Sequence, residues 1–433
     1  MRIKLDRIKI REKALDLLHE YYVYDKFSEE QEKCIVDTMC GKDVVAVLPT
    51  GAGKSLCFQI PALFFEGLTI VITPLVSLMH DQVAQLSTDC NLSGLKKPVP
   101  AEYIDNTRKS KSQVLLDGAA LDRRYKILYL SPERLKNPVF IRFTQKVKID
   151  FIAIDEAHCI SMWGYDFRPV YLDIINFIKG LEKRPVIGAY TATATPVVVD
   201  DIVKILNLDK KGDSKGYSFV QGSCERKNLS FSVKKVYDRD EKRKFLMEYL
   251  DCHKDQCGII YCSTKDETQN LYDYLIQNGV KTAIYHSTDE NLSVKNAEKN
   301  HKMFMSGKCR IMVATSAFGM GINKKDVRFV IHYNMPKDME SYYQEAGRAG
   351  RDGKASECVI LYYRNGKKDD YSVCEGFLES FRKNSDFDEK ITEYHYQLGR
   401  YRLECMAQYC EMEGSGSQEL QMKSEKANMK LAK

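Results

Sequence analysis

The chain has 433 residues, 29% of them charged, and a formal net charge of +6. This length allows two or three domains with their own cores, and the mild positive charge is compatible with nucleic-acid binding without requiring it. No apolar run is long enough to cross a bilayer, and charges interrupt the N-terminal stretch MRIKLDRIKIREKALDLL. Composition therefore excludes a membrane protein and a secretory leader, and a soluble, intracellular protein is expected.

Short apolar runs alternate with longer helical patterns in two successive series. The first series comprises residues 43–48, 68–73, 125–130, 151–154 and 185–190, and the second comprises residues 258–262, 281–286, 310–315, 327–333 and 358–363. Nearly continuous apolar strands between helices are typical of parallel sheets that helices cover on both faces. The sequence therefore predicts an α/β fold with two domains in tandem.

The segment between the two series, residues 208–228, is rich in Gly, Lys and Ser and is interpreted as a linker. We accordingly expect one domain over residues 1–222 and a second over residues 223–365. After residue 366 the pattern becomes helical, which predicts a short helical extension over residues 366–412. The last stretch, residues 413–433, is polar and is expected to be a frayed or disordered tail.

The fourteen cysteines are scattered, and none stands in a C-x-x-C pair. Most lie in apolar stretches, as Cys57, Cys262 and Cys358 do, which indicates reduced thiols packed in protein cores. Cys405 and Cys410 come nearest to a pair of metal ligands, but nothing after them would complete a set of four. No zinc is therefore expected.

The stretch VLPTGAGKSLCFQIP, residues 47–61, follows a predicted strand and opens a predicted helix. Backbone N–H groups of Gly51, Ala52 and Gly53 are suited to cradle a phosphate at the N-terminus of that helix. Lys54 would reach the β- and γ-phosphates, and the Ser55 hydroxyl would bind Mg²⁺. The alternative is a glycine-rich turn that a Lys-Ser pair follows by chance.

Two acids end a buried strand in the stretch FIAIDEAH, residues 151–158. They would lie at the carboxyl end of the strand, where open α/β sheets bind ligands. Asp155 would hold the Mg²⁺, directly or through water, and Glu156 would orient and deprotonate an attacking water. The alternative is an ordinary strand followed by a solvated acidic loop.

A pair of arginines lies in the second series, within YYQEAGRAGRDG at residues 342–353. Arg348 and Arg351 are three positions apart, so on a helix they would share one face. Presented across a cleft between the two domains, they would contact the γ-phosphate, as arginine fingers do in other nucleotide hydrolases. Taken alone, the pair would be interpreted as two surface arginines.

Together these stretches resemble the motifs of the RecQ family of superfamily 2 helicases, from about residue 15 to about residue 365. LPTGAGKS (48–55) resembles the helicase form of the phosphate loop, and YDKFSEEQ (24–31) resembles the adenine-recognition motif. TPLVSLMHDQV (73–83) and SPERL (131–135) resemble the family's DNA-backbone motifs. The other matching stretches are DEAHCISMWGYDFRP (155–169), TATAT (191–195), IIYCSTKDET (259–268), VATSAFGMGIN (313–323) and QEAGRAGR (344–351).

The resemblance implies roles for residues that the chemistry alone does not single out. Thr50 would belong to the nucleotide-binding loop, Gln31 would contact the adenine base, and Tyr24 would lie near that base. Thr191 and Thr193 would help to couple nucleotide to DNA. The chain departs from the family where an arginine usually follows the phenylalanine of the adenine motif, because Ser28 stands there.

The DNA motifs combine phosphate contacts with base stacking. Ser131 is predicted to cap a helix that begins with proline, where exposed N–H groups suit a DNA phosphate. Trp163 is the only tryptophan, and with Phe167 and Arg168 it offers a stacking face and a cation. We predict that Trp163 senses DNA, since a bound base would move the loop that carries the acids and His158. The alternative is a half-buried packing tryptophan.

The resemblance implies two RecA-like domains. The first would bind ATP and Mg²⁺, and the second would be the C-terminal helicase domain. Together they would move 3′ to 5′ along single-stranded DNA. The expected partners are single-stranded, tailed or forked DNA in repair, recombination or replication, and no membrane. The sequence does not fix the oligomeric state, and a monomer is favoured. The family's zinc cysteines and winged helix are not found in this chain. The compartment would be the cytoplasm of a prokaryote or the nucleus of a eukaryote.

Two other functions remain open. One is an RNA helicase of the same superfamily, and the other is a regulatory or scaffold protein that binds DNA without productive turnover. The lysine, acids and arginine named above favour an active enzyme.

Overall fold

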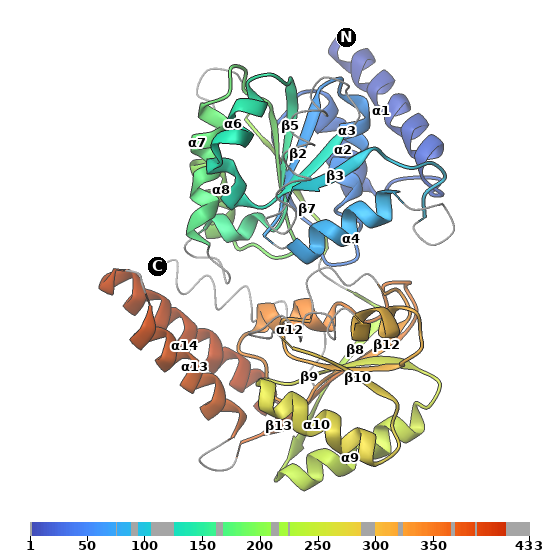
Figure 1. The fold of residues 1–433 in the computed structure, drawn as a ribbon, viewed down its shortest axis with the longest axis vertical. Coiled ribbons are helices and arrows are strands. Elements are labelled where there is room, and N and C mark those ends of the chain that lie inside the picture. Colours follow the sequence, from blue (N-terminus) through green and yellow to red (C-terminus); the bar gives the residue numbers. More distant parts are fainter. Residues whose placement is uncertain are drawn as a thin grey trace. The chain divides into compact units, whose positions relative to one another are not determined.

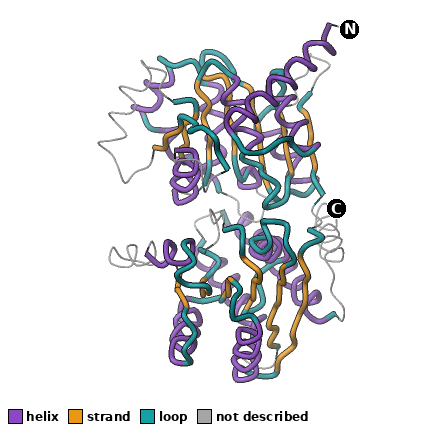
Figure 2. Tube along the Cα trace, turned by 90° about the vertical axis from the view of Figure 1, so that its right-hand side faces the viewer, coloured by secondary structure: helices purple, strands orange, loops and turns teal. Residues whose placement is uncertain are grey.

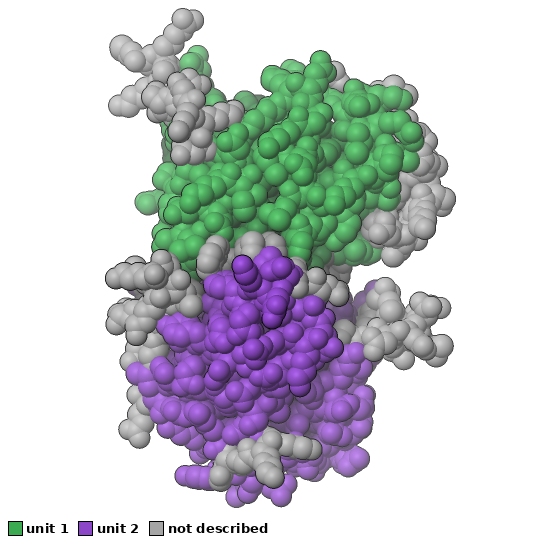
Figure 3. Space-filling model, turned by 90° about the vertical axis from the view of Figure 1, so that its left-hand side faces the viewer, with its two compact units in different colours: residues 1–224 green, residues 225–433 purple. Residues whose placement is uncertain are grey.

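In the computed structural model the chain divides into two compact units, residues 1–224 and residues 225–433 (Figure 3). Each unit is built around its own parallel sheet. The structure describes residues 2–74, 76–87, 94–104, 125–161, 168–208, 216–223, 226–286, 299–318, 324–364, 369–385 and 388–412.

Seven strands of the described residues form the sheet of the first unit, in the order β3-β4-β2-β5-β6-β1-β7. Their bounds are β1 (Val44–Val47), β2 (Leu68–Ile72), β3 (Ala101–Ile104), β4 (Ile127–Leu130), β5 (Ile149–Ile154), β6 (Val186–Thr191) and β7 (Ser218–Gln221). Every neighbouring pair runs parallel. The carboxyl ends of these strands therefore meet at one edge of the sheet.

Helices cover both faces of this sheet (Figures 1 and 2). The α-helices are α1 (Arg2–Tyr21), α2 (Glu29–Met39), α3 (Leu56–Phe64), α4 (Val76–Ser87), α6 (Pro138–Thr144), α7 (Asp173–Lys179) and α8 (Pro196–Ile205). Three short 3-10 helices are η1 (Pro132–Lys136), η2 (Ala157–Ile160) and η3 (Pro169–Leu172). Val44 and Ala46 of β1 pack with α1–α4, while Val45 and Val47 pack with α8 and the helices beside it. Because both faces are buried, the central strands are continuously apolar.

Six described strands form the sheet of the second unit, in the order β10-β11-β9-β12-β13-β8, and all neighbours are parallel. Their bounds are β8 (Leu229–Val236), β9 (Cys257–Tyr261), β10 (Thr282–Tyr285), β11 (Ile311–Ala314), β12 (Val327–His332) and β13 (Ser356–Tyr363). The helices are α9 (Arg239–Cys252), α10 (Lys265–Gln277), α12 (Met339–Ala346), α13 (Asp370–Asn384) and α14 (Glu389–Glu411).

The last two helices belong to the core of the second unit. α9 and α10 bury Leu246 and Leu271 against one face of the sheet, and α12 covers the other face together with Met406 of α14. α13 and α14 lie side by side (Figure 1). A buried ion pair ties α13 to α9, because Lys242 Nζ lies 3.0 Å from both carboxylate oxygens of Asp370. The helical extension is therefore packed into the unit.

The predicted fold class is confirmed, with two parallel α/β sheets flanked by helices and a helical C-terminal extension. The interpretation of residues 208–228 as a linker is wrong in part, because β7 pairs with β1 at the edge of the first sheet. Ser218 and Val220 point inward and Phe219 and Gln221 outward, so this strand has no apolar run. Within the described ranges, no helix has both the length and the apolar character needed to cross a membrane.

Candidate functional site

The predicted phosphate-binding segment connects β1 to α3. Leu48 N donates to Thr191 O of β6 at 2.9 Å, which fixes the start of the loop beside that strand. Gly51 and Gly53 have φ values of 83° and 71°, a left-handed conformation that glycine adopts without steric cost. Lys54 Nζ donates to Leu48 O at 3.3 Å, so its ammonium group folds back over the loop. The loop thus has the tight turns that a phosphate cradle needs.

Gln31 of the predicted adenine motif contacts this loop. Its Nε2 donates to Ala52 O at 2.8 Å, and a Cβ added to Gly53 would lie 2.5 Å from that nitrogen. Its Oε1 accepts from Ser28 N at 3.0 Å, while Ser28 Oγ accepts from Gln31 N at 3.2 Å. This reciprocal capping box begins α2. Ser28, which stands where the family usually has arginine, therefore serves as the N-cap.

The other nucleotide candidates lie around the same loop. Thr50 and Ser55 are half-buried in it. Gln82 Nε2 of α4 donates to Ser55 Oγ at 3.1 Å. Tyr24 is 40% exposed and stacks on Tyr22 with 6.4 Å between ring centroids. The loop is therefore contacted from both α2 and α4, which sequence spacing does not reveal.

Asp155 and Glu156 follow β5 directly, at the carboxyl edge of the sheet. Asp155 is 7% exposed, and its N–H donates to Ile72 O of β2 at 2.8 Å. Burial, with a contribution from the Glu156 carboxylate, raises the pKa of Asp155 to about 7, and the Lys54 ammonium opposes this shift. Glu156 has φ 49° and ψ 47°, a strained backbone conformation of a kind that clusters at functional sites. The phosphate loop and the acids thus share one site.

His158 connects the acids to the end of β6. It is 2% exposed, and its Nδ1 lies 2.8 Å from Thr191 Oγ1 and 3.4 Å from Glu156 Oε2. Thr191 Oγ1 donates to Thr193 O at 3.0 Å and accepts from Thr193 N at 3.3 Å. Hydrogen bonds therefore join His158, Thr191 and Thr193, and the Glu156 carboxylate lies beside the His158 ring, so these four predicted residues form one path of contacts from β5 to the segment after β6.

The donor set fits a magnesium ion with a triphosphate. A cation would stabilise the buried carboxylate of Asp155, whose neighbour Glu156 is also acidic. Mg²⁺ usually keeps several waters and takes one or two protein oxygens together with substrate phosphates, for which Ser55 and Asp155 are suited. Among the described residues no group of three or more His, Cys, Asp or Glu side chains could hold a metal.

Of the residues predicted to contact DNA, Trp163 and Phe167 lie outside the described residues. Ser131 occupies the N-cap position of η1 as predicted, but the helix is a 3-10 helix and the hydroxyl makes no capping hydrogen bond. Arg168 Nη1 donates to Pro74 O at 3.2 Å. The chain next to the predicted tryptophan segment is therefore tied to the segment that leads into α4.

Arg348 and Arg351 do not lie on a helix, so the shared helical face that their spacing would allow does not form. α12 ends at Ala346 with Gly347 as its C-cap, and both arginines lie in the turns that follow. Burial, followed by the charges of Arg348 and Arg226, lowers the pKa of Arg351 to about 9. Because arginine stays protonated at pH 7 even so, the three guanidinium groups form a concentrated positive site in the second unit. Such a site suits an anion.

Sequence reasoning missed the residues that hold this turn in place. Arg226 Nη2 donates to Ala349 O at 3.1 Å and to Gly350 O at 2.8 Å. Asn228 Nδ2 donates to Gly350 O and to Lys354 O, both at 2.9 Å. The two donors lie in the stretch interpreted as a linker, more than a hundred positions from their acceptors, so no local pattern marks them.

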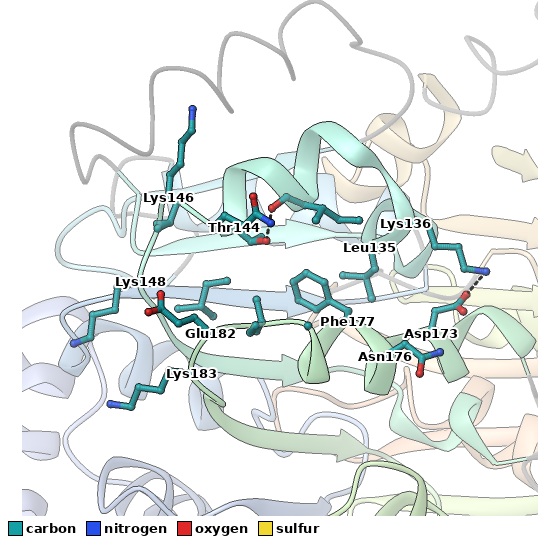
Figure 4. Close-up of a pocket in the computed structure, with 16 residues that line it drawn as sticks. Leu135, Lys136, Thr144, Lys146, Lys148, Asp173, Asn176, Phe177, Glu182 and Lys183 are labelled. Atoms are coloured by element: carbon teal, nitrogen blue, oxygen red, sulfur yellow. Dashed lines mark hydrogen bonds and ion pairs between the residues drawn. The ribbon is translucent and has the colours of Figure 1, made fainter.

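A separate hollow of 1080 Å³ opens around the start of β5 (Figure 4). Leu135, Ile149 and Phe177 form part of its lining, and Lys136 pairs with Asp173 at 2.9 Å on its rim. None of the candidate site residues lines it. It is therefore distinct from the site at the carboxyl edge of the sheet.

Two family models match the chain. Residues 28–202 match the DEAD/DEAH box helicase model, and residues 241–353 match the helicase conserved C-terminal domain model. The first match contains the phosphate loop and the acids, and the second contains the arginine pair.

Several curated relatives are similar over most of the chain. An ATP-dependent DNA helicase RecQ of Bacillus subtilis is 43% identical over 81% of this chain and 56% of its own length. The protein of the same description from Pasteurella multocida is 38% identical over 83% of this chain and 54% of its own length, and that from Haemophilus influenzae is 35% identical over 94% and 60%. The chain thus spans somewhat more than half the length of these relatives.

Solved structures support the fold. Dbp5 of S. cerevisiae bound to RNA and ADP BeF3 aligns over 90% of this chain and 97% of its own, with a TM-score of 0.60 and 14% identity. The Mycobacterium smegmatis helicase Lhr aligns over 87% of this chain and 51% of its own, with a TM-score of 0.61 and 16% identity. At these identities the likeness shows two tandem RecA-like domains and nothing about substrate.

Proposed function

Because the chain belongs to the RecQ family of DEAD/DEAH box helicases, we propose that it is an ATP-dependent DNA helicase that moves 3′ to 5′ on single-stranded DNA. The observation that carries this proposal is the path from Glu156 through His158 to Thr191 and Thr193. An enzyme that couples hydrolysis to movement needs a connection between its catalytic acid and a segment outside the nucleotide site. This path supplies such a connection within the first unit.

The phosphate loop would bind the nucleotide. Mg²⁺–ATP, when bound, supplies the phosphoanhydride bond whose hydrolysis drives movement. N–H groups of Gly51, Ala52 and Gly53 would hold phosphate oxygens, and Lys54 would neutralise their charge. Ser55 would contribute its hydroxyl to the metal. Around the base, we assign Gln31 and Tyr24, with Thr50 as part of the loop.

The acids would perform the chemistry. Asp155 would hold the metal, directly or through water, and Glu156 would orient the attacking water and accept its proton. His158 lies beside the Glu156 carboxylate and restricts its position. We assign Arg348 and Arg351 to the developing negative charge on the transferred phosphoryl group. Their concentrated positive charge in the second unit supports this assignment.

The DNA would lie against the segments that follow the strands. Ser131 at the start of η1 would contact the backbone, and Arg168 with Trp163 and Phe167 would contact a base. Thr191, Thr193 and His158 would transmit this contact to the acids. The substrates we propose are single-stranded, tailed or forked DNA, in repair, recombination or replication.

The test compares ATP hydrolysis and strand separation on matched nucleic acids. We expect ATP turnover to rise at least tenfold with single-stranded DNA and to rise much less with RNA of the same sequence. A short duplex with a 3′ tail is expected to separate, and the same duplex with a 5′ tail is not. Stronger stimulation by RNA would favour an RNA helicase, and DNA binding without any turnover would favour a regulatory protein.

A further inference from the structure

Five polar side chains join the phosphate loop to its surroundings through one buried network. Gln82 Nε2 donates to Ser55 Oγ at 3.1 Å, and Gln82 Oε1 accepts from Gln59 Nε2 and from Tyr129 OH, both at 3.3 Å. Gln59 Nε2 also lies 3.4 Å from Tyr129 OH. Gln59 Oε1 accepts from Tyr22 OH at 3.0 Å. Each amide is thus engaged through both its nitrogen and its oxygen.

This network lies inside the apolar layer between the sheet and α1–α4. Tyr22, Gln59 and Tyr129 are 4%, 6% and 1% exposed. Burial is the main cause that raises the pKa of both tyrosines, so their hydroxyls stay neutral and can donate. The buried Gln59 and the half-buried Gln82 cost stability relative to apolar residues unless their polar atoms are satisfied. A satisfied network of this kind has one defined arrangement, so it transmits displacement between its members.

Ser55, Gln82 and Tyr129 lie in or next to segments that the proposed function already uses. Ser55 lies in the phosphate loop, and Gln59 lies one turn later on α3. Gln82 lies on α4, within the stretch 73–83 that resembles a DNA-backbone motif. Tyr129 on β4 lies two positions before Ser131. The network therefore connects the metal-binding hydroxyl with both segments assigned to the DNA backbone.

We infer that Gln82 is a positioning residue for the Ser55 hydroxyl, and that Gln82, Gln59 and Tyr129 couple Mg²⁺–nucleotide binding to DNA binding. This inference rests on the proposed function. A serine hydroxyl has one donor and two acceptor lone pairs, and an amide nitrogen only donates. Gln82 therefore occupies one lone pair of Ser55 and leaves the other for the metal. A shift of α4 on DNA would move this donor and alter the metal site.

Coupling of this kind is reciprocal. If DNA strengthens the binding of Mg²⁺–nucleotide by some factor, then Mg²⁺–nucleotide strengthens the binding of DNA by the same factor. A merely structural role for Gln82 would lower thermal stability and leave that factor unchanged. The coupling factor therefore distinguishes the two roles.

The experiment compares Gln82→Leu with Gln85→Leu, which removes the same functional group one turn later on α4. Gln85 is half-buried, and its side chain makes no hydrogen bond to the part of the chain that the structure describes. Binding of a fluorescent, non-hydrolysable ATP analogue is titrated with Mg²⁺, with and without a single-stranded oligonucleotide. Tyr129→Phe removes only the hydroxyl that holds Gln82 and provides a second, milder variant.

We expect Gln82→Leu to raise the half-saturating Mg²⁺ concentration by about five- to tenfold, which is the loss of one hydrogen bond. We expect its coupling factor to fall to about 1, with Tyr129→Phe intermediate and Gln85→Leu like the unmodified protein. If Gln82→Leu and Gln85→Leu share the same coupling factor while the unmodified protein binds both ligands, the network assignment is wrong and the proposed function stands. If the unmodified protein binds no Mg²⁺–nucleotide, the network assignment and the proposed function are both wrong.

Discussion

Glu156 and Asn207 are the two described residues other than glycine with a positive φ, and only Glu156 lies at the candidate site. A left-handed conformation costs such a residue on the order of 1–3 kcal/mol, so the surrounding structure must hold it. Here the β5 ladder, the Asp155 side chain and His158 do so, since Asp155 Oδ1 accepts from Glu156 N at 3.0 Å. In this conformation the Glu156 carboxylate lies beside His158, with 3.4 Å between Oε2 and the ring Nδ1.

At the same scale, Lys54→Ala tests the phosphate loop. Because the ammonium group would contact phosphates and not DNA, we expect ATP turnover to be abolished while single-stranded DNA binds within about twofold of the unmodified protein. Turnover is measured by phosphate release and DNA binding by fluorescence anisotropy. Lys179→Ala, an exposed lysine on α7, is the matched control. Near-normal ATP turnover by Lys54→Ala would contradict the assignment of this loop to the nucleotide site.

Arg351→Ala tests the arginine pair. A finger acts mainly in the transition state, so we expect turnover to fall by about 10³-fold while nucleotide affinity changes little. Equilibrium binding of a fluorescent ATP analogue and steady-state turnover separate these effects. Arg239→Ala removes an exposed arginine of the same unit and is expected to change neither. A loss of affinity with unchanged turnover would make Arg351 a binding residue only.

Among the elements, the strands that sequence patterns predicted and those they missed differ in a physical way. Central strands such as β5 and β12 are buried on both faces along most of their length and have nearly continuous apolar runs. β3, β7 and β8 were missed, and each lies at an edge of its sheet. Their burial is interrupted or alternates along the strand, so polar residues break the apolar run. Edge strands whose apolar run is broken in this way are recognised only from their pairing, whereas the edge strand β10 was predicted from its apolar residues.

The candidate site also contains residues that the sequence could predict and contacts that it could not. The phosphate loop and the acids could be predicted because the glycines, lysine and carboxylates stand within short motifs. The contacts of Gln82 with Ser55 and of Arg226 with Gly350 could not, because they join residues 27 and 124 positions apart. Only the folded sheet and its covering helices bring these partners together.

The buried pair between α9 and α13 carries a prediction about stability. Lys242→Met leaves the Asp370 charge buried without its partner, so we expect a loss of about 3 kcal/mol in the free energy of unfolding. Adding Asp370→Asn removes that charge but keeps the acceptor for Asn334 Nδ2, and most of the loss is expected to be recovered. Urea unfolding measures both.

Lys254→Met breaks the exposed pair with Asp251 and provides the control for this stability test. We expect it to change the free energy of unfolding by less than about 0.5 kcal/mol, because solvent screens exposed pairs. Equal effects of Lys242→Met and Lys254→Met would show that the buried pair does not anchor α13.

For the whole molecule, the two compact units have separate apolar cores, which suggests that each can fold alone. We expect residues 1–224, produced by themselves, to unfold cooperatively and to bind Mg²⁺–ATP, because the loop and acids are all present. Turnover is expected to be at least 10³-fold slower than in the whole chain and not to respond to DNA, since the arginine pair is missing. Circular dichroism and phosphate release measure these properties. DNA-stimulated turnover by residues 1–224 at the full rate would contradict the proposal that the second unit supplies the arginine pair for hydrolysis.

The capping box at the start of α2 also bears on which purine the protein accepts. The Gln31 amide oxygen accepts from Ser28 N, and one of its two N–H groups donates to Ala52 O. One acceptor lone pair and one N–H of this amide therefore remain for the base. Adenine presents a donor beside an acceptor along its N6–N7 edge and can use both, whereas guanine presents two acceptors there. With Gln31 placed on the base as proposed, the hydrogen bonds that begin α2 would leave a pattern that favours ATP over GTP. Competition between the two nucleotides for the same site would measure that preference, and an equal affinity for both would contradict it.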